Sequence, residues 1–419
     1  MRELTLNNGL RVLLLPQPHL KSAYFGLWVA GGSVFETAEN NGVSHFIEHI
    51  VFKGSETRTA LEIAKQTDRL GASVNAFTSK EFTHFYTRAP GENITAAAEI
   101  LLDMVLCPKL DDGDIATEKG VILEEIGMCE DDPADVCYEL AESSLFDPSP
   151  YALQILGTKE SVRQTDRARL LRQLARCYTA KRMVIGVGGA FDEGQILGLI
   201  ERTCADLPSG EGAAFPPLGC KQGIYLKKAR FEQTHLMLTA PGTALWHPDR
   251  FALQTVLFLL GTGASSRLNQ RIREQLGLVY QIDAWAGRFV SGGYLAVSLS
   301  LSGENQKTAL SETCRIIRDL PGSITQDELD IAKAKLTSAL MMNREQPHAQ
   351  LGAFGHDLLL RGRITEDETL LRGVRSVTLA QAKDAAARYL DPAAFSLTAV
   401  GSTRSEDFYR TILKGDESR

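Results

Sequence analysis

The sequence predicts an α+β protein built from two similar domains. Its 419 residues exceed what one ordinary hydrophobic core accommodates and suit two domains of about 200 residues each. Stretches that alternate like strands are interspersed with amphipathic helical stretches in both halves of the chain. Landmarks of the first half also return in the second half at a nearly constant spacing, which indicates an internal duplication.

Three landmarks illustrate this duplication. Each occupies the same kind of place in both halves, either after a strand, at the start of a long helix, or before the last strand. The pairs are Ala30-Gly31-Gly32 with Ala240-Pro241-Gly242, Asp114-Ile115-Ala116 with Asp330-Ile331-Ala332, and Tyr178 with Tyr389, at offsets of 210, 216 and 211 residues. Near-equal offsets in chain order are hard to obtain by chance.

A linker separates the two predicted domains. Residues 207–219 concentrate proline, glycine and alanine without periodicity, a composition typical of a connecting segment. We therefore predict a first domain at residues 1–206 and a second domain at residues 220–419.

Composition and charge narrow the class of protein. A net charge of −7 and a pI near 5.7 give no basic surface for nucleic acid. The N-terminus lacks the pattern of a signal peptide, and no apolar run approaches the ~20 residues of a membrane span. The seven scattered cysteines include no Cys-x-x-Cys pair, so we expect buried thiols in a reducing compartment. The expected location is the cytoplasm.

The elements of the first half follow from strand-like and helical periodicity. Strands are predicted at residues 3–15 with a turn at 7–9, and at 22–34, 73–79, 82–88 and 183–189. Helices are predicted at 42–52, 59–70, 94–106, 114–128, 133–146, 160–177 and 195–204. His84 stands alone in its strand, so we expect it to face solvent or a neighbouring strand rather than a metal ion.

The helix over Gly42–Phe52 carries the most informative motif, His45-Phe46-Ile47-Glu48-His49. His45 and His49 are four residues apart and share one face of a helix, so two neutral imidazoles can chelate one zinc ion. Glu48 can stand beside the ion without binding it, where a base for metal-activated water is needed. This order of residues is the inverted zincin motif. The alternative is a core helix with two hydrogen-bonded histidines.

The helix over residues 114–128 adds two carboxylates to the candidate site. Glu118 and Glu125 are seven residues apart, nearly two whole turns, and share a face with Ile122. Buried carboxylates require a cation, and zinc is one. The alternative is that these carboxylates belong to a solvent-exposed helix end. That interpretation fits Glu124 better than it fits Glu118 and Glu125.

The second half lacks counterparts of these groups. An offset of 210 residues places apolar or neutral residues where the first half has the motif, and an offset of 216 does the same for Glu125. The residues that correspond to His45, Glu48, His49 and Glu125 are Thr255, Phe258, Leu259 and Met341. A helix is predicted at residues 266–276. Considered by itself, Arg273 places a positive charge at the negative C-terminal end of this helix, which stabilises the helix by about 0.3–1 kcal/mol.

Taken together, these motifs resemble the pitrilysin or insulysin type of zinc peptidase. The chain is similar to the short members of that group, the bacterial homologues of the mitochondrial processing peptidase β subunit. The resemblance covers nearly the whole chain. It rests on the motif at 45–49, on Glu118 and Glu125, on the pattern Arg273-x-x-x-Gly277-Leu278-x-Tyr280, and on the segments 75–78 and 131–133.

The resemblance implies a role for each candidate residue. His45, His49 and Glu125 would bind Zn²⁺, Glu48 would be the general base, and Glu118 would orient a ligand. Arg273 and Tyr280 would hold the substrate backbone and stabilise the oxyanion. The peptide substrate would add as a strand beside Asn75, Ala76, Phe77 and Thr78.

The resemblance also implies an architecture and a partner. Each domain would be a mixed sheet of about six strands covered by helices. Two chains would form a clamshell around the substrate, and because one chain carries both halves of the site, a homodimer suffices. The expected activity is endopeptidase cleavage of short or unfolded peptides. A heterodimer, a peptidase dedicated to one precursor, and a scaffold or partner subunit of a heterodimeric peptidase are the alternatives.

Overall fold

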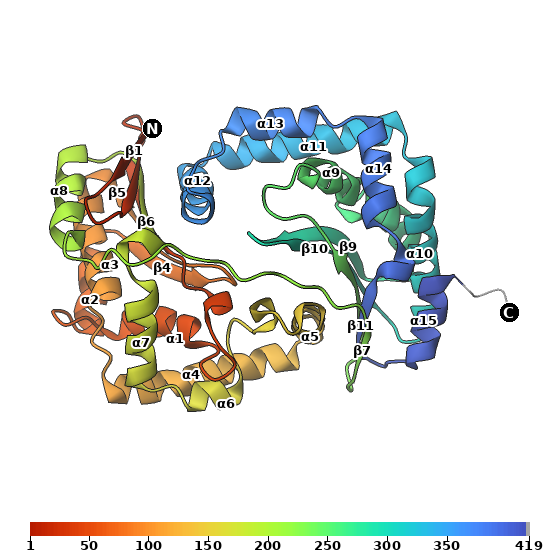
Figure 1. Ribbon diagram of the computed structural model, residues 1–419, viewed down its shortest axis with the longest axis horizontal. Helices are drawn as coiled ribbons and strands as arrows, with labels where there is room; N and C mark the ends of the chain where they lie inside the picture. Colours follow the sequence, from red (N-terminus) through yellow and green to blue (C-terminus); the bar gives the residue numbers. More distant parts are fainter. Residues whose placement is uncertain (416–419) are drawn as a thin grey trace. The chain divides into compact units, whose positions relative to one another are not determined.

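The computed structural model describes residues 1–415, which form two compact units (Figure 1). The first unit contains residues 1–126, 153–215 and 342–365. The second contains 127–152, 216–341 and the described residues from 366 onward. Each unit therefore includes one helix from the opposite half of the chain, α12 (Pro347–Arg361) in the first and α5 (Pro133–Phe146) in the second. Residues 208–223 contain no helix or strand.

The first unit is built on a six-stranded mixed sheet in the order β1-β2-β6-β3-β5-β4. The β2–β6 pair is parallel, and the other neighbours are antiparallel. The strands are β1 (Arg2–Thr5), β2 (Arg11–Pro16), β3 (Ser22–Val29), β4 (Ser73–Thr78), β5 (Thr83–Pro90) and β6 (Met183–Gly189). Strand β4 ends the sheet and has β5 as its neighbour.

The helices that begin in the first half of the chain and belong to this unit are α1 (Val43–Ile50), α2 (Ala60–Arg69), α3 (Ile94–Leu106), α4 (Asp112–Asp131), α6 (Lys159–Arg163), α7 (Arg167–Cys177) and α8 (Glu193–Cys204). Helices α1, α2 and α3 contact strands of the sheet, while α7 contacts α1 and α8 contacts α3. Helix α12 lies against β6 and β3, where its Gly355 meets the Trp28 ring. A Cβ atom on Gly355 would lie 2.8 Å from that ring, so only glycine allows this close approach.

The second unit repeats the arrangement of the first. Its sheet has the order β7-β11-β8-β10-β9, again with one parallel pair, β7–β11. The strands are β7 (Ile224–Lys228), β8 (Thr234–Pro241), β9 (Gln281–Arg288), β10 (Gly293–Leu301) and β11 (Ser396–Gly401). This order matches β2-β6-β3-β5-β4 of the first sheet, which confirms the duplication. The second sheet has five strands because nothing in it corresponds to β1.

The helices of the second unit follow the same plan. They are α5, α9 (Arg250–Gly261), α10 (Gln306–Ser323), α11 (Gln326–Arg344), α13 (Asp367–Arg375), α14 (Leu379–Tyr389) and α15 (Glu406–Lys414). Helix α9 follows β8 as α1 follows β3. Its Thr255 and Leu259 are buried, and Leu253, Val256 and Leu260 join the apolar core. Burial of each leucine contributes about 1.5–3 kcal/mol, so apolar packing holds this helix in the core.

Some local expectations are corrected. Of the two alternatives for His84, the structure supports contact with a neighbouring strand and not exposure to solvent: the residue is buried and stacks on Trp28 of β3 with ring centroids 4.2 Å apart. The helix expected at 266–276 is a π-helix at Asn269–Gln275. All seven cysteines are free, but Cys107 and Cys220 are exposed rather than buried.

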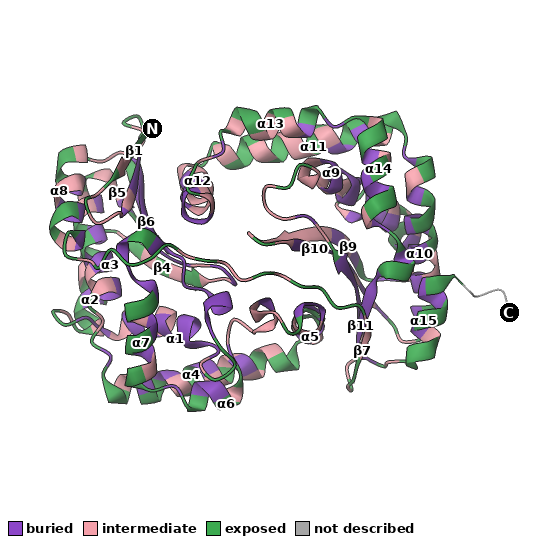
Figure 2. Ribbon diagram, viewed as in Figure 1, coloured by how far each residue is buried: buried purple, intermediate pink, exposed green. Residues whose placement is uncertain are grey.

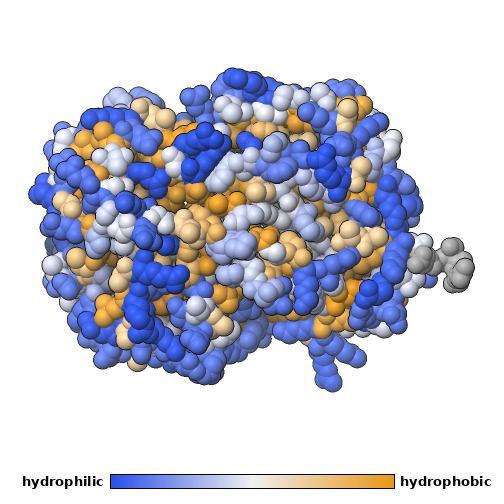
Figure 3. Space-filling model, in the orientation of Figure 1, coloured by the Kyte–Doolittle hydropathy of each residue, from blue (hydrophilic) through white to orange (hydrophobic). Residues whose placement is uncertain are grey.

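The described residues include no helix long and apolar enough to cross a membrane. Hydrophilic residues spread over much of the face drawn in Figure 3, with apolar areas between them.

Candidate metal centre

Helix α1 presents the histidine motif from inside the first unit. Val43, Phe46, Ile47 and Ile50 are buried around it and anchor the helix in the core, as its purple colour in Figure 2 shows. His45 is itself buried. An eight-residue helix is marginal by itself, so tertiary packing determines where its two imidazoles point.

Helix α4 supplies the carboxylates. Its buried residues Ile115, Glu118, Ile122 and Ile126 recur at helical spacing, so one face of the helix turns inward. Glu118 belongs to that face, and Glu125 lies half-buried at its border. The expectation that both carboxylates lie on the apolar side, and not on a solvated end, is confirmed for Glu118.

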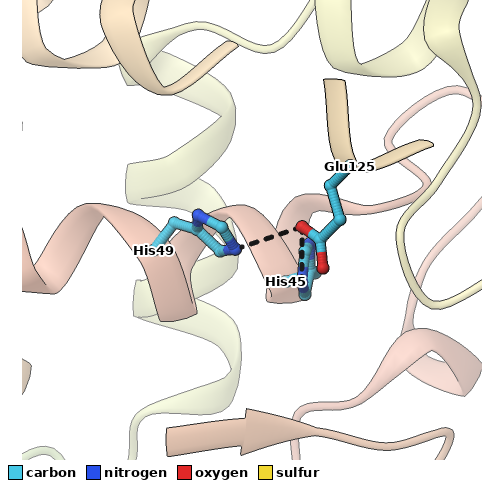
Figure 4. A group of neighbouring side chains, drawn as sticks. All are labelled: His45, His49 and Glu125. Carbon is cyan, nitrogen blue, oxygen red and sulfur yellow. Dashed lines mark ion pairs between the residues drawn. The ribbon is translucent and has the colours of Figure 1, made fainter. Parts of the chain in front are cut away.

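The two helices bring three ligand-type side chains together (Figure 4). The Oε2 atom of Glu125 lies 3.7 Å from Nε2 of His45 and 3.5 Å from Nε2 of His49. One ligand atom from each of the three residues lies within 4.8 Å of the other two. Both imidazoles point toward the same carboxylate.

This geometry fits a tetrahedral metal ion. Ligand atoms about 2.0–2.1 Å from a tetrahedral zinc ion are separated from one another by about 3.3 Å. The two measured separations, 3.5 and 3.7 Å, are close to that value. Oε2 of Glu125 is also buried without a hydrogen-bond partner among the described residues, and a buried carboxylate oxygen needs a cation or donor. The residues therefore fit the metal that their spacing predicts.

The electrostatics of His45 suit a neutral ligand. Burial, and then the neighbouring His49 ring, lower the pKa of His45 to about 3. Both effects disfavour the imidazolium form. The ring is therefore neutral near pH 7 and keeps a lone pair for a metal ion.

His49 is oriented by a buried carboxylate. Its Nδ1 atom lies 3.2 Å from Oε2 of Glu118, while Nζ of Lys53 lies 2.5 Å from Oε1 of the same carboxylate. A carboxylate at Nδ1 holds the proton on that nitrogen and leaves Nε2 free to face Glu125. The Lys53 ammonium balances the buried charge of Glu118.

Glu48 lies on the same helix but makes a different contact. Its Oε2 atom accepts a 2.6 Å hydrogen bond from Oγ1 of Thr78. Burial raises the pKa of Glu48, the Thr78 and His49 contacts oppose that shift, and Glu125 adds to it. A carboxylate whose pKa is raised is a stronger base than an exposed one, as proton abstraction from water requires.

The edge strand β4 lies beside this group. Helix α1 packs against it, and its residues alternate between exposed and half-buried. Asn75 and Phe77 are exposed, whereas Ala76 and Thr78 are half-buried. Because β4 ends the sheet, its outer backbone groups are available to another strand.

Arg273 and Tyr280 belong to the second unit. Arg273 is exposed on the π-helix at 269–275, where its Nε lies 3.9 Å from Glu274. Tyr280 is 72% exposed and lines a hollow of about 480 Å³ together with Trp285 and residues of α5. Its backbone N–H donates to the carbonyl of Ser300, which fixes it at the start of β9.

Two contributors to the first unit's group are absent from the set predicted from the sequence: Lys53, which pairs with Glu118, and Glu36, which caps helix α1. Thr78 belongs to that set only as part of the substrate strand, whereas its side chain also contacts Glu48. Lys53 could have been found, because it is four residues beyond His49 and so near it on a continued helix. The Thr78 contact joins residues that are far apart in the chain, and Glu36 caps α1 from a loop six residues before Gly42, so neither follows a helical spacing.

Two family profiles match the chain. The profile described as insulinase (peptidase family M16) matches residues 11–159, and the one described as peptidase M16 inactive domain matches residues 165–336. The first match includes the group on α1 and α4. The second includes Arg273 and Tyr280.

Named proteins resemble the chain along most of its length. A Bacillus subtilis protein named uncharacterized zinc protease YmxG is 32% identical over 384 residues, which cover 90% of this chain and 93% of the relative. The Mycobacterium leprae protein named uncharacterized zinc protease ML0855 is 33% identical, with 90% and 86% covered.

Solved structures share the fold. A Pseudomonas fluorescens crystal structure described as peptidase M16 inactive domain has a TM-score of 0.89 at 22% identity, and 97% of this chain and 99% of that chain are covered. A protease from Helicobacter pylori has a TM-score of 0.87 at 20% identity, with 96% and 99% covered.

Proposed function

Because the chain belongs to the insulinase family, peptidase family M16, we propose that it is a zinc-dependent endopeptidase that cleaves short or unfolded peptides. The observation that carries this proposal is the convergence of His45, His49 and Glu125. These residues would hold one Zn²⁺ ion. A zinc ion bound there supplies Lewis acidity, which lowers the pKa of water and polarises a carbonyl group.

Glu48 is the general base in this proposal. It lies on the helix that carries both histidines, and Thr78 holds one of its oxygens at 2.6 Å. Its other oxygen can accept a proton from the attacking water and later pass that proton to the leaving amine. Glu118 supports the reaction indirectly, by holding Nδ1 of His49.

Strand β4 receives the substrate. An extended peptide can pair with the outer edge of Ser73–Thr78, because main-chain hydrogen bonds bind any sequence in extended form. The exposed Asn75 and Phe77 side chains would contact the peptide's side chains on one face. Such binding is weakly selective, as a peptidase with several substrates requires.

Arg273 and Tyr280 complete the site from the second domain. Arg273 would hold the substrate backbone, and the Tyr280 hydroxyl would donate to the oxyanion that forms at the scissile carbonyl. Their exposure is compatible with reaching a ligand. We propose that the second domain of one chain serves the zinc domain of another in a homodimer.

Metal removal tests the proposed activity. Protein treated with a chelator and dialysed should fail to cleave a mixture of unfolded peptides, and one equivalent of zinc should restore cleavage. The matched control is protein carried through the same dialysis without chelator. Full activity in protein whose zinc content is below a few per cent would refute the proposal.

A further inference from the structure

Helix α1 begins without a capping side chain of its own. Its N-cap residue is Gly42, with a φ of +87°. A Cβ atom at Gly42 would lie 2.5 Å from the carbonyl oxygen of Leu156. Serine, threonine or aspartate, the usual N-cap residues, therefore cannot occupy this position.

Glu36 performs the capping from six residues upstream. Its Oε2 atom accepts hydrogen bonds from the N–H of Gly42 at 2.7 Å and from Nδ2 of Asn41 at 2.9 Å. Its Oε1 atom accepts from the N–H of Ser44 at 2.8 Å. One carboxylate thus satisfies two amides at the start of α1, in place of a side chain at the N-cap.

A carboxylate is the only side-chain group that meets all three contacts. Each partner is a donor, so a carboxamide at position 36 would turn an NH₂ group toward another N–H. Glu36 is buried. Its burial raises its pKa, while the hydrogen bonds from Asn41, Ser44 and Gly42 oppose that shift. The positive end of the helix also favours an anion at this point.

The hydrogen bonds from Gly42, Asn41 and Ser44 to Glu36, here called the clasp, are close to the candidate ligands. Ser44, whose N–H is held by Glu36, immediately precedes His45, and α1 has only two turns. The Ser44 hydroxyl also accepts a 3.1 Å hydrogen bond from Nε2 of Gln173 on α7. A small rotation of the first turn would therefore move both imidazoles relative to Glu125, which is fixed on another helix.

We propose that Glu36 is a positioning residue for the metal group, a role that rests on the proposed zinc peptidase function. By fixing the first turn of α1, Glu36 sets the distances from Nε2 of His45 and His49 to Glu125. Removal of a group that orients a metal ligand typically lowers the affinity for the metal by about 10–100-fold.

The test compares two capping carboxylates of the first unit. Glu36→Gln removes the clasp on α1, and Asp192→Asn alters the N-cap of α8, where Asp192 accepts from the N–H of Gln195 at 2.8 Å. The dissociation constant for zinc is measured by competition with a chelating dye, alongside thermal melting. We expect Glu36→Gln to raise that constant about 10–100-fold and Asp192→Asn to leave it unchanged.

An unchanged zinc affinity in Glu36→Gln would overturn the inference while leaving the peptidase function intact. So would an equal loss in Asp192→Asn, because that result would indicate a general loss of stability. If Glu36→Gln fails to fold, Glu36→Asp keeps the charge but is one methylene shorter, and wild-type zinc affinity in that variant would overturn the inference instead. Wild-type protein that binds zinc but cleaves no peptide would refute the proposed function alone.

Discussion

The Thr78 hydroxyl donates a 2.6 Å hydrogen bond to the carboxylate of Glu48, which joins the edge strand β4 to the helix that carries the histidines. Thr78 Oγ1 also lies 3.3 Å from the hydroxyl of Thr83 on β5. A direct hydrogen bond therefore connects the strand proposed to bind substrate with the proposed base.

Replacement of Thr78 should impair turnover more than substrate binding. Thr78→Val keeps the shape but removes the donor, so Glu48 loses the contact that fixes its orientation. A hydrogen bond to a charged group contributes about 1.5–3 kcal/mol, so we expect kcat to fall at least about tenfold with a small change in KM. Steady-state kinetics measure this, with Thr78→Ser as the matched control that keeps the hydroxyl. Equal rates in the two variants would show that the contact is dispensable.

The zinc content of single variants identifies the ligands. His45→Ala, His49→Ala and Glu125→Ala should each bind much less zinc than wild type, which should hold about one ion per chain. Glu124→Ala is the matched control, because Glu124 adjoins Glu125 but is exposed. Elemental analysis after dialysis gives the content. Any of the three variants that retains full zinc would remove that residue from the set.

Arg273 and Tyr280 should affect catalysis without affecting zinc. An oxyanion donor is worth about 2.7–4 kcal/mol in other hydrolases, so Tyr280→Phe and Arg273→Ala should slow hydrolysis about 10²–10³-fold. If Arg273 only complements a helix end, its loss should lower the melting temperature slightly and leave the rate unchanged. Kinetics measured beside thermal melts separate the two roles.

The proposed homodimer predicts rescue between two inactive variants. Glu48→Gln damages the zinc domain, and Tyr280→Phe damages the second domain. In a hybrid dimer with shared sites, one site carries both lesions and the other carries neither. Purified hybrids, co-expressed with different tags, should therefore recover up to about half of wild-type activity.

The control is each variant purified as a homodimer, which should stay inactive. A purified hybrid that is as inactive as its parents would show that each chain builds its site alone. Failure to recover any protein that carries both tags would show that no dimer forms.

Much of the first unit's group was predictable because the ligands obey local helical spacing. His45 and His49 are one turn apart and Glu118 and Glu125 two turns apart, so the sequence places each pair on one helix face. The prediction that the second half keeps the scaffold is confirmed by the shared strand order. There Thr255 and Leu259 are buried in α9.

Other features could not be predicted because they depend on long-range packing. The burial of His84 results from its stacking on Trp28, and Gly355 of α12, from the opposite half of the chain, packs on that same ring. The exchange of α5 and α12 between the units leaves no mark on periodicity. The capping of α1 is a local contact, but it comes from Glu36, six residues before Gly42, and not from a side chain at the N-cap, where the usual sequence signature would be sought.

Peptide hydrolysis by Glu48→Gln, with zinc content measured on the same sample, tests the proposed chemistry most directly. Glutamine preserves the size of the side chain and can still accept from Thr78, but it cannot take a proton from water. Zinc content should equal that of wild type, and turnover should fall about 10²–10⁴-fold, the usual contribution of general base catalysis. Near-wild-type turnover in the zinc-loaded variant would contradict the assignment of Glu48 as the base.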